Sequence, residues 1–479
     1  MTTRFSTYLA TLRADDFGLG FLWAWIYCTW FTVGVLPLQF FATAAGEGMM
    51  LGNISWLVSL LTCSVLLFLM PRLLHRPLLS GNVFMAAASA TVCLGTVLMH
   101  FSYGQDVPWL FFLASVLTGV GSAGMWGLWG QRYEKKTRSL GMVAPLSALV
   151  VCLFILFCWL IPEEASFVLC AALPLVSAAL YLASARQDAS ILDPGPSPTP
   201  YSAPQAAEPE SLSTLDRRKA LTVLVKLCIF VGGACALCSF GRIAPLSADG
   251  EHVAVPSILA GMGIILLISW RNEKMNHTFD FVRPARWLLL LEVVTFALLL
   301  SDLPFGTELA ARLSFAISTC FDFLLFMCLT RVIQRGAFSS TVAFCISEGS
   351  VQVGWLLGDA GAAAFVSFFG YATELLRPLY ALAICLLFAV MLFIIDQQGS
   401  LRKLIGDRSN RESVESTSRA FHLSPRETEI AVLLSQGRSV PYISDELFLA
   451  KSTVETHVKH IYKKTGVHSR QELIDLLRS

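Results

Sequence analysis

The residues Leu423–Leu477 read LSPRETEIAVLLSQGRSVPYISDELFLAKSTVETHVKHIYKKTGVHSRQELIDLL, and this stretch decides how the C-terminal part of the chain folds. Ser424, Pro425 and Glu427 form a capping-box sequence, which is typical of the start of a helix. Apolar residues then recur at helical spacing between short Gly- and Ser-containing breaks. These signals predict short helices at about 425–436, 439–448, 452–465 and 470–477.

The third of these helices is expected to have two different faces. Val454, Val458 and Ile461 form an apolar stripe for the domain core, and the opposite face carries hydroxyl and charged groups. Lysines there are suited to phosphates, whereas Glu455 and Thr456, early in the helix, are placed to meet base edges. Short helices followed by such a helix form the arrangement that enters a DNA major groove. The predicted DNA contacts are Lys451, Ser452, Thr453, Glu455, Thr456, Lys459, Lys463 and Lys464.

The same stretch resembles the LuxR-type helix-turn-helix family. The matching residues are LSPRE at 423–427, the turn at 437–439, Ile443 and much of the block 452–467. The resemblance implies a four-helix domain that binds DNA as a dimer, with base and phosphate contacts at Glu455, Thr456 and Lys459. It also implies that the fourth helix supplies the dimer contact, which falls here on Leu473, Ile474 and Leu477.

This sequence departs from the family pattern at two places. Glu455 stands where many members have Lys, which points to a different target sequence. Val440–Tyr442 replaces the usual Asn-Lys-Glu run, so a phosphate contact is missing there. A small protein-interaction domain with a solvated basic face is the alternative interpretation of the whole stretch.

The rest of the chain is very apolar. Of its 479 residues 14% are charged and 55% hydrophobic, whereas soluble globular domains carry about 25% charged residues. The shortage of charge is concentrated in residues 17–396, where apolar runs long enough to cross a bilayer recur. We therefore predict an all-α fold, a polytopic membrane bundle followed by the four-helix domain. About twelve spans are expected, at 17–41, 54–70, 78–100, 107–129, 140–161, 165–184, 220–240, 254–270, 285–303, 308–331, 341–369 and 376–396.

Two polar segments divide the chain. Residues 185–219 are rich in Pro, Ser and Ala, and we predict a disordered cytoplasmic linker there. Residues 397–420 form a second polar segment, a cytoplasmic tether. The remaining predicted domains are a first six-helix membrane half at 1–184, a second at 220–396 and the DNA-binding domain at 421–479.

The positive charges of the loops alternate along the chain. Lys and Arg are present near the N-terminus, at 71–77, 130–139, 271–284 and 331–340, and around the central linker. The intervening loops hold only Arg242. Because positive loops stay in the cytoplasm, both termini are predicted on the cytoplasmic side of a bacterial membrane. An even number of spans then places the C-terminal domain in the compartment that contains DNA.

Two six-span halves joined by a cytoplasmic linker resemble the major facilitator superfamily in topology. The family's loop motif between spans two and three is not reproduced in Pro71–Pro77. This departure counts against transport and leaves a receptor role open.

Ionisable residues inside the predicted spans fall in the second half, at Lys226, Glu292, Asp322, Glu348 and Asp359. Such residues are costly in a membrane and usually face a cavity or a partner. We predict a polar ligand pocket. Its members are Asp322, Glu348, Gln352 and Asp359, with aromatic walls at Trp30, Trp126 and Trp355. Internal salt bridges are the alternative for the charges. Belts at the membrane interface are expected for most of the tryptophans, among them Trp23, Trp25 and Trp129.

Motifs of catalysis are missing from the sequence. It contains no Walker motif, no paired metal-ligand cluster and no Ser or Cys nucleophile motif, so neither an enzyme nor a cofactor or metal is predicted. Cys235 and Cys238 form a C-x-x-C in an apolar run, which we interpret as small-residue packing, with a redox or metal site as the alternative.

Together these patterns predict a membrane-embedded one-component transcription regulator. A small molecule would bind among the spans, and the tethered domain would bind promoter DNA as a homodimer. The first rival is a secondary transporter of the major facilitator type with a regulatory tail. The second is a membrane scaffold whose C-terminal domain binds protein.

Overall fold

The computed structural model divides into two compact units, Met1–Leu404 and Ile405–Ser479. All regular secondary structure in the described part of the chain is α-helical or a single turn of 3₁₀ helix. The residues that the structure describes are 13–32, 35, 49–73, 81–104, 107–134, 142–192, 214–243, 251–274, 281–301, 303, 305–334, 340–369, 373–396, 418, 421–435, 439–447, 449–467 and 469–478.

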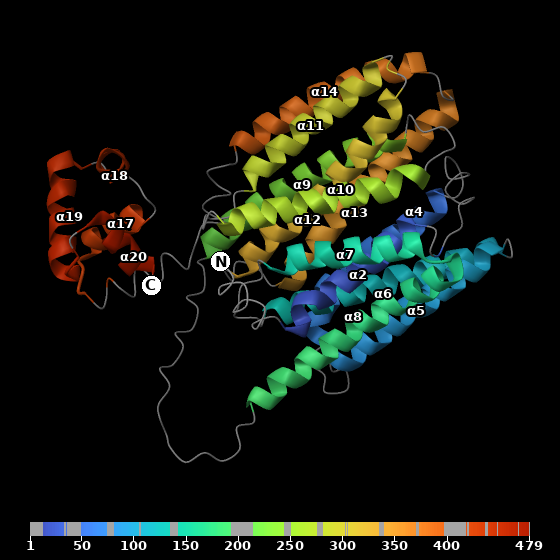
Figure 1. Ribbon diagram of the computed structural model, residues 1–479, viewed down its shortest axis with the longest axis horizontal. Coiled ribbons are helices and arrows are strands. Elements are labelled where there is room, and N and C mark those ends of the chain that lie inside the picture. Colours follow the sequence, from blue (N-terminus) through green and yellow to red (C-terminus); the bar gives the residue numbers. More distant parts are fainter. Residues whose placement is uncertain are drawn as a thin grey trace. The chain divides into compact units, whose positions relative to one another are not determined.

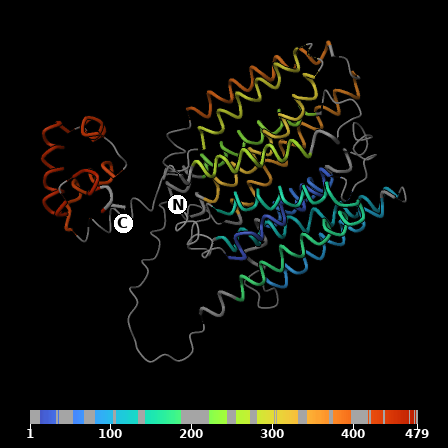
Figure 2. Tube along the Cα trace, viewed as in Figure 1, coloured from blue at the N-terminus to red at the C-terminus, as the bar shows by residue number. Residues whose placement is uncertain are grey.

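Twelve helices are described in the first unit (Figure 1). The first six are α2 (Ala14–Phe31), α4 (Met49–Leu73), α5 (Gly81–Gly104), α6 (Pro108–Glu134), α7 (Val143–Leu160) and α8 (Glu163–Leu192). The second six are α9 (Thr214–Ile243), α10 (Glu251–Lys274), α11 (Val282–Leu300), α12 (Gly306–Gln334), α13 (Ser340–Phe369) and α14 (Thr373–Asp396). Figure 2 shows the two sets gathered on opposite sides of this unit.

Each predicted span falls on one of these helices. Eight helices in the described part are long and apolar enough to cross a membrane, and α4 and α10 contribute shorter apolar segments, Ile54–Leu66 and Val255–Arg271. The predicted class, a polytopic all-α membrane bundle with a C-terminal helical domain, is confirmed. The number of spans stays a prediction.

Several helix ends differ from the predicted bounds. α2 ends at Phe31 rather than near residue 41, because Thr32 is extended and its hydroxyl donates to the Cys28 carbonyl at 2.5 Å. α8 continues to Leu192 and α9 begins at Thr214, so both helices extend into the predicted linker 185–219. A helix satisfies its own backbone hydrogen bonds and can continue beyond an apolar run. Linker residues 193–213 and tether residues 397–417 lie outside the described residues.

The two halves meet through α4, α6 and α7 of the first half and α10, α12 and α13 of the second. α13 packs against α4 and α6 of the first half, and α10 and α12 pack against α7. Of the apolar stretch of α12, 94% is buried, against 22% for α14, so α12 lies at the centre and α14 at the periphery. Within the second half α13 lies very close to α9, and the glycines Gly354 and Gly358 allow this approach. A Cβ on either would stand 2.3 Å from the carbonyl oxygen of Gly232 or Ala236, respectively.

The second unit is a compact helical domain with its own core. Its helices are α17 (Pro425–Ser435), α18 (Val440–Leu447), α19 (Lys451–Thr465) and α20 (Arg470–Arg478), each within about two residues of its predicted bounds. α19 packs against α17 and α18, and α20 packs against α17. The buried apolar side chains are Ile430, Ala431, Leu434, Ile443, Val454, Ile461 and Leu473.

Candidate nucleic-acid interface and membrane pocket

The start of α17 is fixed by the predicted capping box. The Ser424 backbone N–H donates to Oε2 of Glu427 at 2.7 Å, and the Glu427 N–H donates to the Ser424 hydroxyl at 3.3 Å. Two backbone donors at the helix start are therefore satisfied by side chains.

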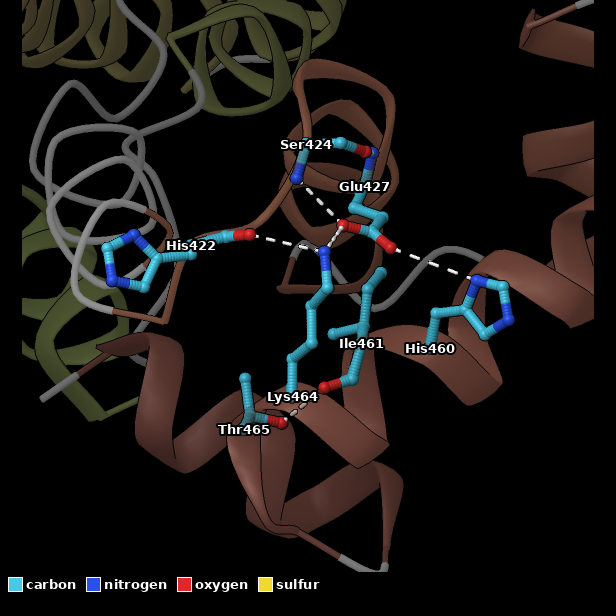
Figure 3. A network of polar contacts seen from close by, with 7 residues as sticks. All are labelled: His422, Ser424, Glu427, His460, Ile461, Lys464 and Thr465. Carbon is cyan, nitrogen blue, oxygen red and sulfur yellow. Dashed lines mark hydrogen bonds and ion pairs between the residues drawn. The ribbon is translucent and has the colours of Figure 1, made fainter.

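Glu427 also joins α17 to α19 (Figure 3). Lys464 Nζ donates to Glu427 Oε2 at 2.6 Å and to the His422 carbonyl at 3.1 Å. His460 Nδ1 lies 3.9 Å from the other carboxylate oxygen. Burial raises the pKa of Glu427, but the hydrogen bonds from Lys464 and Ser424 and the charge of Lys464 outweigh it, so the pKa is lowered overall. Lys464, predicted to contact DNA, thus also stabilises the domain, while 39% of its side chain stays exposed.

The two ends of α19 are set by backbone geometry. Its first turn is closed by hydrogen bonds from the Thr453 and Val454 N–H groups to the Ala450 carbonyl, at 2.9 and 3.1 Å. At the other end Gly466 has a φ of 71°, the left-handed conformation that glycine adopts without strain, and its N–H donates to Tyr462 at 2.9 Å. Both ends support a rigid helix.

The turn between α18 and α19 is also held by hydrogen bonds. The Ser444 hydroxyl donates to the Leu449 carbonyl at 2.7 Å, and the Leu449 N–H donates back to the Ser444 carbonyl at 3.0 Å. Arg426 of α17 donates to the Leu447 carbonyl at 3.0 Å. α18 and α19 are therefore fixed relative to each other, as a helix-turn-helix requires.

Most predicted DNA contacts lie on one exposed face of α19. Val454 and Ile461 are buried on the opposite side, and Thr453 is half-buried. The Thr456 hydroxyl donates to the Ser452 carbonyl at 2.8 Å, which directs its methyl group away from the backbone acceptor. The exposed members on this face are Lys451, Ser452, Glu455, Thr456, Lys459 and Lys463, and Lys464 is exposed beside the Glu427 ion pair.

One of the three residues predicted for the dimer contact belongs to the core of the domain instead. Leu473 is fully buried in the core of its own domain and presents no surface to a second copy. An amphipathic stripe on a short helix shows which side is apolar, but it does not show whether the partner is the same chain. The side chains of Ile474 and Leu477 lie outside the described residues.

In the first unit a narrow hollow lies between the two halves, and its free interior of about 30 Å³ has room for one or two water molecules. It contains five of the predicted ligand residues, namely Trp30, Asp322, Glu348, Gln352 and Trp355. A smaller hollow beside it is lined by the predicted Trp126, together with Trp23, Asp322 and Glu348. The lining of the larger hollow also includes Trp23, Trp25, Ile26, Tyr27, Ser55, Trp56, Ser59, Ser122 and Val351.

Hydrogen bonds across this hollow connect the halves. The Tyr27 hydroxyl of α2 donates to Asp322 Oδ2 of α12 at 3.3 Å. Gln352 Nε2 of α13 donates to Ser59 of α4 at 3.2 Å and to Glu348 at 2.9 Å. The Gln352 Oε1 atom is buried and has no hydrogen-bond partner.

Aromatic rings form most of the remaining wall. Trp56 stands between Trp30 and Trp355, with ring centroids 6.2 and 5.0 Å away and the planes inclined at 65° and 51°. Trp23 stacks on Phe323 at 4.2 Å. The interface belt expected for Trp23, Trp25 and Trp129 is wrong, because all three are almost fully buried and pack between helices.

Asp359 does not reach this hollow. It forms an ion pair with Arg242 at 3.3 Å and accepts a hydrogen bond from Ser239, both on α9. The predicted grouping of Asp359 with the ligand residues is therefore wrong, and the salt-bridge alternative holds for it. Glu292 is buried apart from the hollow and accepts a hydrogen bond from Ser314 at 2.8 Å.

Tyr27, Trp56 and Ser59 were not predicted as pocket residues. The sequence did contain a signal for Tyr27. Trp23, Tyr27 and Trp30 follow each other at four- and three-residue spacing, which places them on one face of α2. Trp56 and Ser59 carry no comparable mark, since neither is ionisable or part of a polar run.

Two groups of side chains have the chemistry of metal ligands and lie close together. The sulfur atoms of the buried Cys28, Cys158 and Cys170 are within 4.8 Å of one another. Ligand atoms of Glu427, His457 and His460 show the same proximity, but Lys464 already occupies one Glu427 oxygen. Cys235 and Cys238 are buried free thiols, and neither belongs to a metal-ligand group within the described residues.

Comparison with known proteins separates the two units. Residues 422–477 match the family described as "Bacterial regulatory proteins, luxR family". A probable transcriptional regulatory protein NarL of Mycobacterium tuberculosis is 48% identical over 48 residues, 10% of this chain and 22% of that protein. The oxygen regulatory protein NreC of Staphylococcus aureus is 37% identical over 67 residues, 14% of this chain and 31% of that protein. The chain thus spans less than a third of the length of either relative.

The solved structure of the nucleoside transporter NupG is similar in fold to most of the chain. It is 13% identical with a TM-score of 0.44, over 80% of this chain and 96% of the transporter. Neither figure is high enough to carry a functional conclusion. Residues 422–477 form a LuxR-type helix-turn-helix domain at the end of a helical membrane protein.

Proposed function

We propose that this protein is a membrane-embedded one-component transcription regulator, in which a hollow between two helical halves senses a small molecule and α19 binds promoter DNA. One observation carries the proposal: a single chain joins a LuxR-type domain to a polytopic membrane body. No catalytic step belongs to it. The chain needs no separate sensor protein, because both ends of the signal lie in one polypeptide.

On the DNA side, the exposed face of α19 supplies the contacts. Lys451, Lys459 and Lys463 neutralise phosphates and give affinity that falls with salt. Glu455 and Thr456 contact base edges, the first through a cytosine amino group and the second through a thymine methyl. Ser452 and Thr453 contact phosphate at the start of the helix. Lys464 is left out of this set because it binds Glu427.

On the membrane side, the larger hollow is the sensing site. Its polar groups come from both halves, so a molecule bound there contacts α2 and α4 on one side and α12 and α13 on the other. Such a ligand shifts the balance between two arrangements of the halves if it binds one of them more tightly. Trp126 borders the neighbouring hollow and supports Trp23, with ring centroids 5.2 Å apart.

We further propose that both termini lie in the cytoplasm of a bacterial cell and that two copies bind one promoter. Positive loop charge supports the orientation. Ile474 and Leu477 remain candidates for the dimer contact, whereas the buried Leu473 does not.

The DNA-binding face is tested with a matched pair of lysines on α19. Lys459→Ala removes a phosphate contact, so affinity for promoter DNA falls. The slope of log affinity against log salt concentration decreases in magnitude by about one, and thermal stability is unchanged. Lys464→Ala breaks the Glu427 ion pair, so the melting temperature falls. Fluorescence anisotropy with labelled promoter and thermal unfolding measure both effects.

The promoter is identified first, by genome-wide mapping of DNA bound to the full chain and to a chain ending at Leu404. Loss of bound sites in the shortened chain supports the proposal. A full chain that enriches no DNA, or a Lys459→Ala variant that binds its promoter as tightly as the original, overturns it.

A further inference from the structure

We infer that the larger hollow takes an organic cation, a small amine or quaternary ammonium compound with an apolar body. This inference rests on the proposed sensing role of the same hollow and specifies the chemistry of its ligand. It follows from three properties of the lining: two acids without a basic partner, an inclined set of indole rings, and an acceptor that lacks a donor.

The first property is the charge of the lining. Asp322 and Glu348 both border the hollow, and the hydrogen bonds they receive come from the neutral donors Tyr27 and Gln352. No Lys, Arg or His is found among the described residues that line it. Arg242 lies against Phe315, 5.0 Å from the ring centroid, and is already paired with Asp359.

Two acidic side chains in an apolar setting are costly when no positive group accompanies them. A cationic ligand supplies that group, and it interacts with both acids at once because they border the same space. Without a cation each acid can instead be neutralised by a proton, so an anionic or neutral ligand gains no ionic interaction with them.

The second property is the aromatic wall. Trp30, Trp56 and Trp355 are inclined to one another rather than stacked in parallel, and Trp23 and Tyr27 lie on the α2 side. Inclined rings present several electron-rich faces to one space, and such faces attract cations. The same rings provide apolar surface for the body of the ligand. A purely inorganic cation does not use this surface, so the lining favours an organic one.

The third property is the arrangement of acceptors. Gln352 Oε1 is buried without a hydrogen-bond donor, although its amide nitrogen is fully engaged with Ser59 and Glu348. With one oxygen each from Asp322 and Glu348, this atom makes a third acceptor around the hollow. A primary ammonium has three N–H donors, which matches this number, whereas a quaternary ammonium has none and is attracted by the acids and the rings alone.

The position of these groups allows a bound cation to affect the contacts between the two halves. Asp322 is bonded to Tyr27 across the two halves, and Gln352 to Ser59. A cation that binds the Asp322 carboxylate competes with the Tyr27 hydroxyl for it, and so with a bond between the halves. Its binding therefore differs between arrangements of the halves in which this bond is made or broken.

The test compares four single-ring compounds on the purified full chain in lipid nanodiscs. Benzylammonium and benzyltrimethylammonium carry the positive charge, benzyl alcohol is neutral, and phenylacetate is negative. Tryptophan fluorescence reports binding because indole rings line the hollow. We expect both cations to bind at least about tenfold more tightly than the other two compounds. Equal or tighter binding of the alcohol or the acid overturns the inference, as does a failure of every cation in a panel extended to larger aryl-alkyl amines.

Variants locate the site. Asp322→Asn and Glu348→Gln keep the shape of the side chains and are each expected to weaken cation binding by about tenfold or more. Glu308→Gln is the matched control, since Glu308 is an exposed acid at the start of α12, 56% exposed and paired with Arg312. Trp355→Ala is compared with Trp109→Ala, whose side chain is 68% exposed. Unchanged cation affinity in both acid variants overturns the inference. The compound series on the original chain needs no variant and so does not depend on their folding.

The outcome is separable from that of the proposed function. DNA binding by the chain without any ligand tests the regulator role alone. Cation binding in a chain that binds no DNA would contradict the regulator role and support the ligand class. DNA binding in a chain that prefers neutral or anionic compounds would support the regulator role and contradict the ligand class.

Discussion

Glu427 connects three segments of the C-terminal domain through one carboxylate. It receives the Ser424 backbone N–H at the start of α17 and the Lys464 ammonium from the end of α19, and Lys464 in turn reaches the His422 carbonyl. Its side chain is 6% exposed, so these bonds are partly shielded from water. One ionised group thus adds a polar connection between α17 and α19 to their shared apolar core.

This connection predicts a specific response of the domain to pH. The pKa of Glu427 is lower in the folded domain than its ordinary value of about 4.3 in an unfolded chain. A lowered folded pKa means that the carboxylate stabilises the fold above the unfolded pKa and that this contribution is lost as the pH falls through the folded pKa. We therefore expect the melting temperature of residues 405–479, which form a compact unit, to fall below about pH 4.3.

The variant Glu427→Gln provides the control for this effect. It cannot ionise, so its melting temperature is expected to be lower at neutral pH and to change less in acid. Circular dichroism at a series of pH values measures both proteins. Parallel pH curves for the two would show that another group is responsible.

At the scale of elements, the close approach of α13 to α9 fixes the geometry of the second half. Gly354 and Gly358 lie one helical turn apart and both face α9, where the nearest atoms are backbone carbonyl oxygens. Backbone atoms cannot rotate aside, so a side chain there must separate the helices. Gln352 and Trp355 are on the same helix, and separation therefore also disturbs the hollow.

We predict that Gly358→Ala lowers the stability of the full chain by about 1–3 kcal/mol, because its Cβ would stand 2.3 Å from the Ala236 oxygen. Gly233→Ala and Gly263→Ala are the matched controls, since a Cβ at either position meets nothing within 4 Å. Thermal unfolding in detergent measures the three variants. Equal melting temperatures for Gly358→Ala and the controls would contradict the close approach.

The elements themselves were largely predictable from the sequence, because apolar run length and helix-end residues are local properties. The capping box at Ser424 and the stop at Gly466 were predicted and found. Which elements meet was not predictable. Tyr27 and Asp322 are 295 residues apart in the chain, and Asp359 has its partner Arg242 117 residues away. No local pattern carries such pairings, so the hollow was predicted with Asp359 in it and without Tyr27.

At the scale of the whole molecule, the regulator role requires that the chain return to its starting side of the membrane. Eight helices in the described part meet the requirements of a span by length and composition, and twelve were predicted. Both numbers are even. The difference comes from α2, α4, α10 and α11, which are predicted spans but are not among the eight. Because they form two consecutive pairs, α2 with α4 and α10 with α11, either number returns the chain to the same side. α2 carries Asp15 and Asp16 in its first turn, and α11 carries Arg283, Arg286 and Glu292, which lowers the apolar character of both.

Reporter fusions at two connections decide between the two numbers. If all twelve helices cross, the connection 42–48 lies outside the cell, and the connection 275–280, flanked by Lys274 and Arg283, lies in the cytoplasm. Alkaline phosphatase fused within 42–48 is then active and within 275–280 inactive, whereas eight crossings give the opposite pattern. A third fusion after Leu404 is expected to be inactive in either case, because the DNA-binding domain needs the cytoplasm. Activity at that third site would exclude promoter binding by this chain, since it places α19 on the side of the membrane that contains no DNA.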